Sequence, residues 1–294
     1  MCSPSNLSLD FRILLTLKER GLGLSGTLGP YISIVFILLV LFQPTYHVLN
    51  SKEICKEVKE DPRLKVFKKE WFEGKDCLDI GCNQGLITIS IAKEYCCRSI
   101  RGIDIDANLV NSAYWNLKRI SKLVSTSSQS SIASESELSK RVNGSLEQST
   151  VPTNEDSGLP QNDLLNRVSF QKENFVERVC PHSEEYDVIL CLSVSKWIHL
   201  NWGDDGLVTL FSNVWRLLRP GGIFVLEPQP WKSYQKNYRV SETATFNYNN
   251  IVFYPCLFQE ILLDKIGFKT VENITESLPG SVTGFDRPIF VLRK

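Results

Sequence analysis

The residues best suited to chemistry form a glycine-containing turn after a short apolar stretch. Asp79, Gly81, Asn83 and Gly85 lie in the sequence Asp79-Ile-Gly-Cys-Asn-Gln-Gly85, and Asp104 follows roughly 20 positions later. Glycine lets a backbone approach a ligand closely, and a helix that starts there offers unpaired N–H groups. An acid at the end of the next strand can bind ribose hydroxyls. The pattern predicts a site for a ligand that contains a ribose, and the alternative is an ordinary strand-to-helix turn.

The glycine spacing separates this turn from two common nucleotide-binding motifs. Gly81 and Gly85 follow the pattern G-x-x-x-G, so the dinucleotide fingerprint G-x-G-x-x-G is absent. The sequence also lacks Gly-Lys-Ser/Thr, which excludes the phosphate-binding loop of nucleotide hydrolases.

A second group of chemically useful residues combines cations with aromatic rings. It comprises Lys196-Trp-Ile-His199 and Trp231-Lys-Ser-Tyr-Gln-Lys-Asn-Tyr-Arg239, and no acid occurs from Trp231 to Ser241. Cations hold phosphates, and aromatic faces stack on bases. The alternatives are a solvated loop for the second stretch and a hydrogen-bonded polar residue for His199.

The overall composition excludes several classes of protein. The 294 residues include 33 Lys and Arg, 33 Asp and Glu, and 43% hydrophobic residues, so the chain is no histone-like nucleic-acid binder. The nine cysteines form no C-x-x-C pair, and there are only three histidines, so we expect no metal site. Cysteines within apolar runs are typical of a reducing compartment.

Strands alternating with helices must position these residues. The predicted strands are Asp76–Ile80, Ser99–Asp104, Val168–Phe170, Tyr186–Cys191, Ile223–Glu227 and Arg287–Arg293. The predicted helices are Leu86–Tyr95, Ala107–Leu123, Asp204–Leu218 and Phe258–Ile266. This order predicts an α/β fold, Rossmann-like, with a mostly parallel doubly wound sheet and helices on both faces.

Two segments depart from this alternation. Residues 1–60 form an atypical N-terminal segment with an apolar run at 31–42. A membrane anchor is one hypothesis for residues 28–49, but it would have to include two prolines. The alternative is a buried or irregular segment. Residues 124–163 are rich in serine and lack aromatic residues, which predicts a disordered insertion within a domain that spans residues 61–294. The insertion has a net charge of −4, so the rest of the chain is mildly basic.

The glycine turn and Asp104 resemble the class I S-adenosylmethionine-dependent methyltransferases. A closer resemblance, to the bicoid-interacting protein 3 family of methylphosphate capping enzymes, is carried by five further stretches. They are Gly102-Ile-Asp-Ile-Asp106, Leu192-Ser-Val-Ser-Lys-Trp-Ile-His-Leu-Asn-Trp-Gly203, Leu217-Leu-Arg-Pro-Gly-Gly222, Leu226-Glu-Pro-Gln-Pro-Trp-Lys-Ser-Tyr234 and Gly284-Phe-Asp-Arg-Pro-Ile289. The family's Tyr- and Arg-rich upstream segment is replaced here by the apolar run and Asn50–Cys55.

The resemblance implies methyl transfer from S-adenosylmethionine to a terminal 5′ phosphate of RNA, either a triphosphate or a monophosphate end. The cofactor site it implies comprises Asp79, Gly81, Asn83, Gly85, Asp104 for the ribose, Asn174 and Phe175 beside the adenine, and Leu192 behind the sulfonium. The RNA end would be held by Lys232, Tyr234, Lys236, Arg239 and Arg287, with Lys196 and His199 as positioning residues.

Two alternatives remain at this stage. One is a methyltransferase of the same fold that acts on a small molecule or a protein, and the other is an inactive module that binds cofactor or RNA. We expect a nuclear or cytoplasmic monomer, with RNA-binding proteins as further partners.

Overall fold

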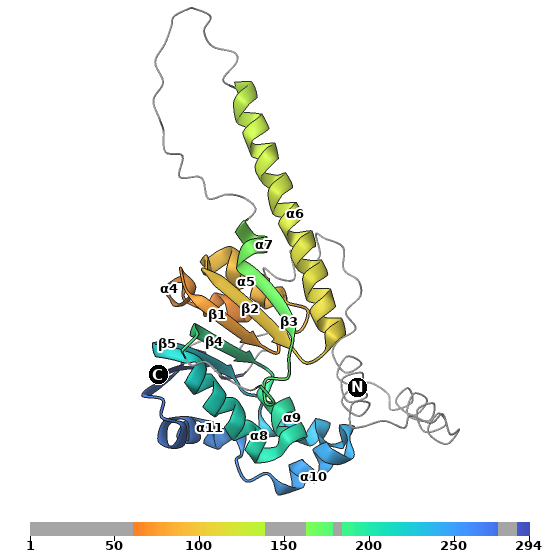
Figure 1. Ribbon diagram of the computed structural model, residues 1–294, viewed down its shortest axis with the longest axis vertical. Coiled ribbons are helices and arrows are strands. Elements are labelled where there is room, and N and C mark those ends of the chain that lie inside the picture. The colour runs from red at the N-terminus through yellow and green to blue at the C-terminus, as the bar shows by residue number, and fades with distance from the viewer. Residues whose placement is uncertain (1–60, 139–162, 179–183, 276–286) are drawn as a thin grey trace, which may run out of the picture. The chain divides into compact units, whose positions relative to one another are not determined.

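The computed structural model describes residues 61–138, 163–178, 184–275 and 287–294 (Figure 1), and the side chains of 124–138 and of Asp163 lie outside this description. The predictions for residues 1–60, the apolar run at 31–42 and residues 139–162 therefore fall outside the described residues. Within the described part, no helix combines the length and the apolar character needed to cross a membrane.

A seven-stranded sheet forms the centre of the described domain. Its strands run in the order β3-β2-β1-β4-β5-β7-β6. They are β1 (Asp76–Ile80), β2 (Ser99–Asp104), β3 (Val168–Lys172), β4 (Tyr186–Leu192), β5 (Leu218–Glu227), β6 (Thr270–Asn273) and β7 (Phe290–Arg293). Strands β1 to β5 pair in parallel, whereas β7 runs antiparallel to β5 and β6. The predicted mostly parallel sheet is confirmed.

One face of the sheet is covered by the helices from the first half of the chain. They are the 3-10 turn η1 (Pro62–Lys65) and helices α4 (Lys69–Phe72), α5 (Leu86–Tyr95), α6 (Ala107–Leu138) and α7 (Asp163–Arg167). Because strand residues alternate between the two faces, Cys77, Ile100 and Val188 point to this side and pack with Phe72 and Ile89.

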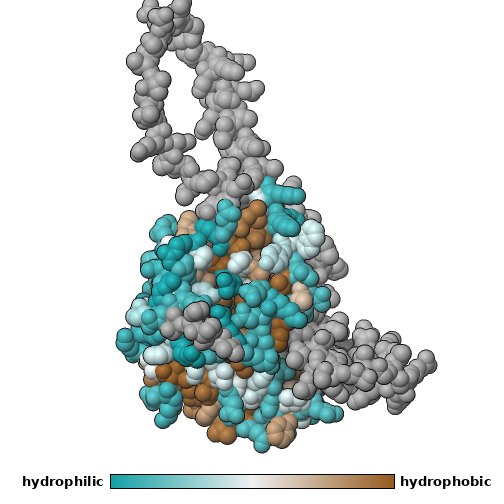
Figure 2. Space-filling view, viewed as in Figure 1, coloured by the Kyte–Doolittle hydropathy of each residue, from teal (hydrophilic) through white to brown (hydrophobic). Residues whose placement is uncertain are grey.

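The other face is covered by helices from the second half, principally α8 (Ser195–Leu217), α11 (Phe258–Glu260) and the π-helical turn η5 (Ile261–Ile266). Leu78, Ile189 and Phe224 point to this side and pack with Phe211 and Phe258. The sheet thus has helices on both faces, as predicted (Figure 1). With the apolar side chains buried in these two layers, the surface seen in Figure 2 is mainly hydrophilic, with smaller hydrophobic areas between.

A small helical lobe follows β5. It consists of α9 (Trp231–Asn237), η3 (Tyr238–Val240), α10 (Glu242–Asn250) and η4 (Pro255–Leu257). It has its own buried cluster, formed by Leu200 of α8 with Tyr234, Ala244 and Ile251. The sequence did not predict helices here, because its aromatic and polar residues show little helical periodicity.

Several predicted boundaries differ from the structure. Helix α6 continues through Leu138, so the boundary predicted at Val124 is wrong for the backbone of 124–138. No glycine or proline occurs between Leu123 and Leu138 to end the helix, and serine has only a moderate helix penalty. Helix α8 consists of two helical segments that meet at a bend at Gly203, where φ is 64° and ψ is −164°. The predicted start at Asp204 therefore corresponds to the second segment, and the first segment, which begins at Ser195, was not predicted.

Candidate active site

The chemically useful residues meet at the carboxyl ends of the parallel strands. Ile80, the last residue of β1, pairs with Ile103 on one side and with Cys191 on the other. Leu192 at the end of β4 pairs with Glu227 at the end of β5. The strand order reverses between β1 and β4, and a crevice at such a switch point is where open α/β sheets bind ligands.

The glycine turn after β1 lies directly against the turn after β4. The backbone N–H groups of Gly81 and Cys82 donate to the carbonyl of Ile103, at 2.8 and 2.9 Å. Gly81 has φ of 72°, and a Cβ atom at this position would lie 2.2 Å from Cγ2 of Val194. Glycine is therefore required for the β1 and β4 turns to approach each other.

Gly85 has a packing function. Its φ is 73°, and a Cβ atom there would lie 2.4 Å from the ring of Phe170 in β3 and 2.8 Å from Ala113 in α6. The first turn of α5 can lie this close to α6 and β3 only because Gly85 has no side chain. The side chain of Asn83, with φ of 53°, accepts from Gln84 N at 2.7 Å within the same turn.

Asp104 lies beside this turn, as the sequence predicts. Its side chain is 6% exposed and accepts from Asn83 N at 2.9 Å and from Asp106 N at 3.0 Å. Burial raises the pKa of Asp104 above its ordinary value. Two carboxylate oxygens offer about four acceptor sites, so these backbone bonds leave acceptor capacity for a ligand hydroxyl. A buried carboxylate at the end of β2 therefore fits a ribose hydroxyl.

Asp79 occupies a more interior position. It is 3% exposed, and Thr88 Oγ1 donates to it at 2.6 Å, which joins β1 to α5. Burial raises the pKa of Asp79 to about 6. In the structure Asp79 supports the turn from inside the sheet.

The segment after β3 lies next to Asp104, since the backbone N–H of Glu173 donates to the carbonyl of Asp104 at 2.9 Å. Phe175 is buried in the core on the α8 side, and Asn174 accepts from Val176 N at 3.2 Å. Leu192, at the end of β4, is 8% exposed. The fold brings these three predicted cofactor residues to the same edge as Asp104 and Gly81.

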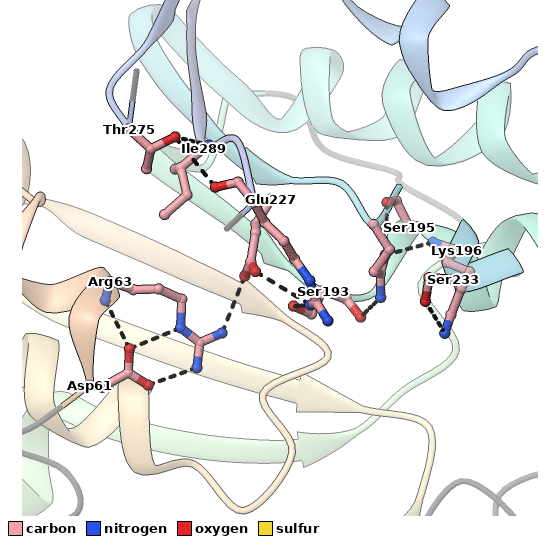
Figure 3. Close-up of polar contacts among 11 residues, drawn as sticks. Asp61, Arg63, Ser193, Ser195, Lys196, Glu227, Ser233, Thr275 and Ile289 are labelled. Carbon is pink, nitrogen blue, oxygen red and sulfur yellow. Dashed lines mark hydrogen bonds and ion pairs between the residues drawn. The ribbon is translucent and has the colours of Figure 1, made fainter. Parts of the chain in front are cut away.

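Two cations, Lys196 and Arg287, lie near the carboxyl ends of β4 and β5, and we call them the cation pair. Figure 3 shows Lys196 beside Ser233. Lys196 is 4% exposed; its Nζ lies 3.0 Å from Ser233 Oγ and 3.9 Å from the centre of the Trp197 ring. Burial, together with the charge of Arg287, lowers the pKa of Lys196 to about 7. Arg287 donates to Ser193 Oγ at 2.7 Å.

Glu227 joins this pair to the first described segment of the chain. It is fully buried, with Arg63 Nη1 at 3.3 Å from one oxygen and Arg287 Nη1 at 3.5 Å from the other (Figure 3). Arg63 is in turn held by Asp61 at 2.8 Å. Asp61, Arg63 and Glu227 were not predicted as site residues from the sequence. Glu227 could have been predicted, because it is an acid at the end of an apolar strand, next to Pro228. Nothing in the sequence indicates that Arg63 contacts Glu227.

Gln229 was also missed, and it fixes the turn that carries Lys196. It is 3% exposed; its side-chain amide donates to the carbonyl of Ser193, and its oxygen accepts from Lys196 N at 3.2 Å. Ser193 has φ of 62°, an uncommon conformation for a residue other than glycine. Gln229 thus holds a strained turn at the site, with Ser193 beside Arg287.

His199 and Tyr234 are internal and do not line a surface. Both are fully buried; His199 Nδ1 lies 3.2 Å from the Tyr234 hydroxyl, and Nε2 lies 2.7 Å from Asp204 Oδ1. Burial lowers the pKa of His199, which favours the neutral ring. Tyr234, which was predicted to hold the RNA end, is turned by α9 into the cluster with Leu200, so this structure does not expose its ring to a base. Buried in this way, His199 is placed to hold α9 against α8.

The remaining predicted cations, Lys232, Lys236 and Arg239, lie on the surface of α9 and η3. Lys232 and Lys236 are four residues apart and share one face of α9. Arg239 Nε donates to the Tyr238 hydroxyl at 2.7 Å. They are exposed, in contrast to the buried Lys196.

A glycine turn at a switch point, a buried acid after the second strand and a reversed β7 define this domain as a class I methyltransferase. Residues 78–224 match the family described as a methyltransferase domain, and residues 186–294 match the family described as Bicoid-interacting protein 3. A probable RNA methyltransferase of Arabidopsis thaliana is 57% identical over 252 residues, which are 85% of this chain and 79% of the relative.

Two relatives with more specific names extend the comparison. The U6 snRNA methylphosphate capping enzyme Amus of Drosophila melanogaster is 34% identical and covers 85% of this chain and 73% of its own length. The mouse 7SK snRNA methylphosphate capping enzyme is 38% identical over 80% of this chain, which spans 38% of the mouse protein. The chain belongs to the bicoid-interacting protein 3 family of methyltransferases.

Proposed function

We propose that this chain transfers a methyl group from S-adenosylmethionine to the terminal 5′ phosphate of an RNA. Membership of the family supports the reaction class, and relatives named as snRNA methylphosphate capping enzymes support RNA as the substrate. The observation that carries the proposal for this chain is the cation pair of Lys196 and Arg287.

The pair is suited to an anion. Among the described residues, Lys196 contacts the hydroxyl of Ser233 and the ring of Trp197, and no carboxylate is in contact with its ammonium group. Burying a charge without a counter-charge is unfavourable, and the nearby Arg287 adds repulsion. An anionic phosphate between the two would relieve both effects through charge-assisted hydrogen bonds.

The cofactor would lie on the other side of the switch point. Asp104 would accept hydrogen bonds from its ribose, the Gly81 turn would contact its amino-acid part, and Asn174, Phe175 and Leu192 would border the rest. S-adenosylmethionine supplies an electrophilic methyl group when it is bound.

Little acid–base chemistry is then required of the protein. A terminal phosphate has its second pKa near 6, so its oxygen is already anionic at neutral pH. The chain contributes orientation, and ideal alignment of two reactants is worth about 7–11 kcal/mol. Lys196 and Arg287 would set the phosphate, while Lys232, Lys236 and Arg239 on the surface of α9 and η3 would guide the following phosphates.

The test is transfer of labelled methyl to RNA of one sequence with triphosphate, monophosphate or hydroxyl ends, followed by mass analysis of the 5′ nucleotide. We expect transfer to one or both phosphate ends and none to the hydroxyl end. The comparison also decides between triphosphate and monophosphate substrates. Equal transfer to the hydroxyl-ended RNA would contradict the proposal, and cofactor binding without transfer would support an inactive binding module.

We further propose that residues 61–294 form the methyltransferase domain and that it acts in the nucleus. Support for nuclear action comes from the relatives named for small nuclear RNAs. Fractionation of cells that express the full chain tests this: co-sedimentation with cytosol alone would contradict it.

A further inference from the structure

The solvent face of helix α6 carries a row of side chains that the proposed reaction does not use. Asn111, Trp115, Lys118 and Lys122 are all exposed and are spaced by four, three and four positions, so they lie on one face of the helix. We call this row the α6 stripe. The opposite face is buried against the sheet by apolar residues: Val110, Ala113, Leu117 and Ile120.

Trp115 is the central residue of the stripe. It is 71% exposed, more than any other large hydrophobic side chain in the described part of the protein. The ammonium group of Lys118 lies 5.5 Å from the centre of its ring. A tryptophan face next to a lysine can stack on a base while the lysine contacts a phosphate.

The charges around Trp115 favour a polyanion over a protein surface. From Ala107 to Leu123 the sequence contains three cations and no acid. The exposed Phe246 of α10 provides a contrast, since it is 68% exposed but its helix contains one acid and no cation. An exposed indole accompanied by cations and no acid is thus a property of residues 107–123 of α6, whereas the two acids of this helix, Glu135 and Glu137, lie near its other end.

The stripe is within reach of an RNA whose end lies at the cation pair. Helix α6 starts just after β2, and two strand spacings, about 10 Å, separate β2 from β4. Trp115 lies two turns into the helix, about 12 Å along its axis. Because the stripe lies on the solvent side of a helix about 10 Å across, the path is on the order of 30 Å, which corresponds to roughly nine nucleotides at about 3.4 Å each.

We propose that the α6 stripe binds single-stranded RNA downstream of the 5′ end, with a base stacked on Trp115 and phosphates at Lys118 and Lys122. This inference rests on the proposed function, because it takes the methylated RNA as the ligand. It adds a second contact, which acts on long RNA and leaves the reacting phosphate untouched.

The first experiment compares an unstructured 30-nucleotide RNA with a trinucleotide, both with the phosphate end that the protein methylates. For Trp115→Ala we expect KM for the 30-mer to rise at least fivefold, while kcat and KM for the trinucleotide change less than twofold. Trp115→Phe should recover most of the loss, because stacking needs a ring. Unchanged KM for the 30-mer with Trp115→Ala would overturn the inference.

Salt dependence tests the cations separately. Lys118→Gln with Lys122→Gln should lower the slope of log KM against log salt for the 30-mer by about 1.4, which corresponds to two phosphates on a single strand. The matched control is Lys93→Gln with Lys265→Gln, which removes two exposed lysines from α5 and η5 and should leave the slope unchanged. Equal slopes for the two double variants would contradict the proposed phosphate contacts.

A binding measurement separates this inference from the proposed function. Fluorescence anisotropy of a labelled, hydroxyl-ended 30-mer reports the stripe without any methyl transfer. We expect its affinity to fall at least fivefold with Trp115→Ala. If transfer fails but this difference is found, the proposed function is wrong and the RNA surface stands; if transfer succeeds but the variants bind alike, the stripe is not an RNA surface.

Discussion

Replacing Lys196 by methionine tests the proposed site most directly, because a methionine fills a similar volume without the charge. With its pKa lowered to about 7, Lys196 is charged in roughly nine-tenths of molecules at pH 6 and in roughly one-tenth at pH 8. If the charged form binds the RNA phosphate, the titration of Lys196 alone should lower kcat/KM for RNA about tenfold across this interval. The phosphate itself should produce the acidic limb near pH 6.

The expected result is a bell-shaped profile for the parent and the loss of its alkaline limb in Lys196→Met. At pH 6 the variant should lose about 10- to 150-fold in kcat/KM, which corresponds to about 1.5–3 kcal/mol for one hydrogen bond to a charged group. Lys236→Met, which removes an exposed lysine from α9, is the matched control and should keep both limbs. An alkaline limb that persists unchanged in Lys196→Met would refute the assignment.

Stability provides a readout of Lys196 that does not depend on activity. Its folded-state pKa, about 7, lies below the ordinary value of 10.5, so the folded state binds fewer protons than the unfolded state between these values. The free energy of unfolding should therefore rise with pH from about 7 to 10.5, by at most about 5 kcal/mol. Lys196→Met should be more stable than the parent at pH 7, and the difference should shrink toward pH 10.5 in urea denaturation.

Three further changes test other parts of the site and fold. Asp104→Ala should weaken S-adenosylmethionine binding by about 1.5–3 kcal/mol in calorimetry, through loss of a hydrogen bond to a charged acceptor; equal affinity would contradict the ribose contact. Gly85→Ala should lower the free energy of unfolding by about 2–4 kcal/mol in urea, because a Cβ atom would meet Phe170 at a positive φ; a smaller change would mean that α5 can shift. Deleting residues 126–161 should leave both Tm and methyl transfer nearly unchanged, and a cooperative loss of folding would show that this segment packs.

The regular part of the fold could be predicted from the sequence because its elements are short, apolar and separated by clear turns. Strands β1 and β4 have buried residues on both faces, so their sequences are mainly apolar runs, as in Tyr186–Cys191. Strand β6 was missed because it lies at the edge of the sheet, and its residues from Thr270 to Asn273 are only partly buried. A strand at the edge of the sheet buries fewer side chains, so its sequence lacks the apolar pattern from which strands are predicted.

The cofactor half of the site was easier to predict than the RNA half. Gly81 and Asp104 belong to consecutive elements, and their spacing is itself the signal. Tyr234 was assigned to RNA from its aromatic and basic neighbours, but which face of α9 is buried depends on Leu200 and Ala244, which pack against it from other helices. The lysines next to Tyr234 in the sequence could not show which way its ring points, because tertiary packing alone decides that orientation.

The arrangement around Glu227 shows which cations of the site are already compensated within the chain. Arg63 and Arg287 share Glu227, and Asp61 binds Arg63 on its outer side, so each arginine has a carboxylate within 3.5 Å. Lys196 has none among the described residues, and burial together with the charge of Arg287 lowers its pKa. Because carboxylates already accompany the two arginines, a further negative charge beside Arg287 would compensate Lys196. A substrate that carries its own anion at the reacting end would supply this charge, whereas a neutral small molecule would not; the chain's own charges thus favour a phosphate.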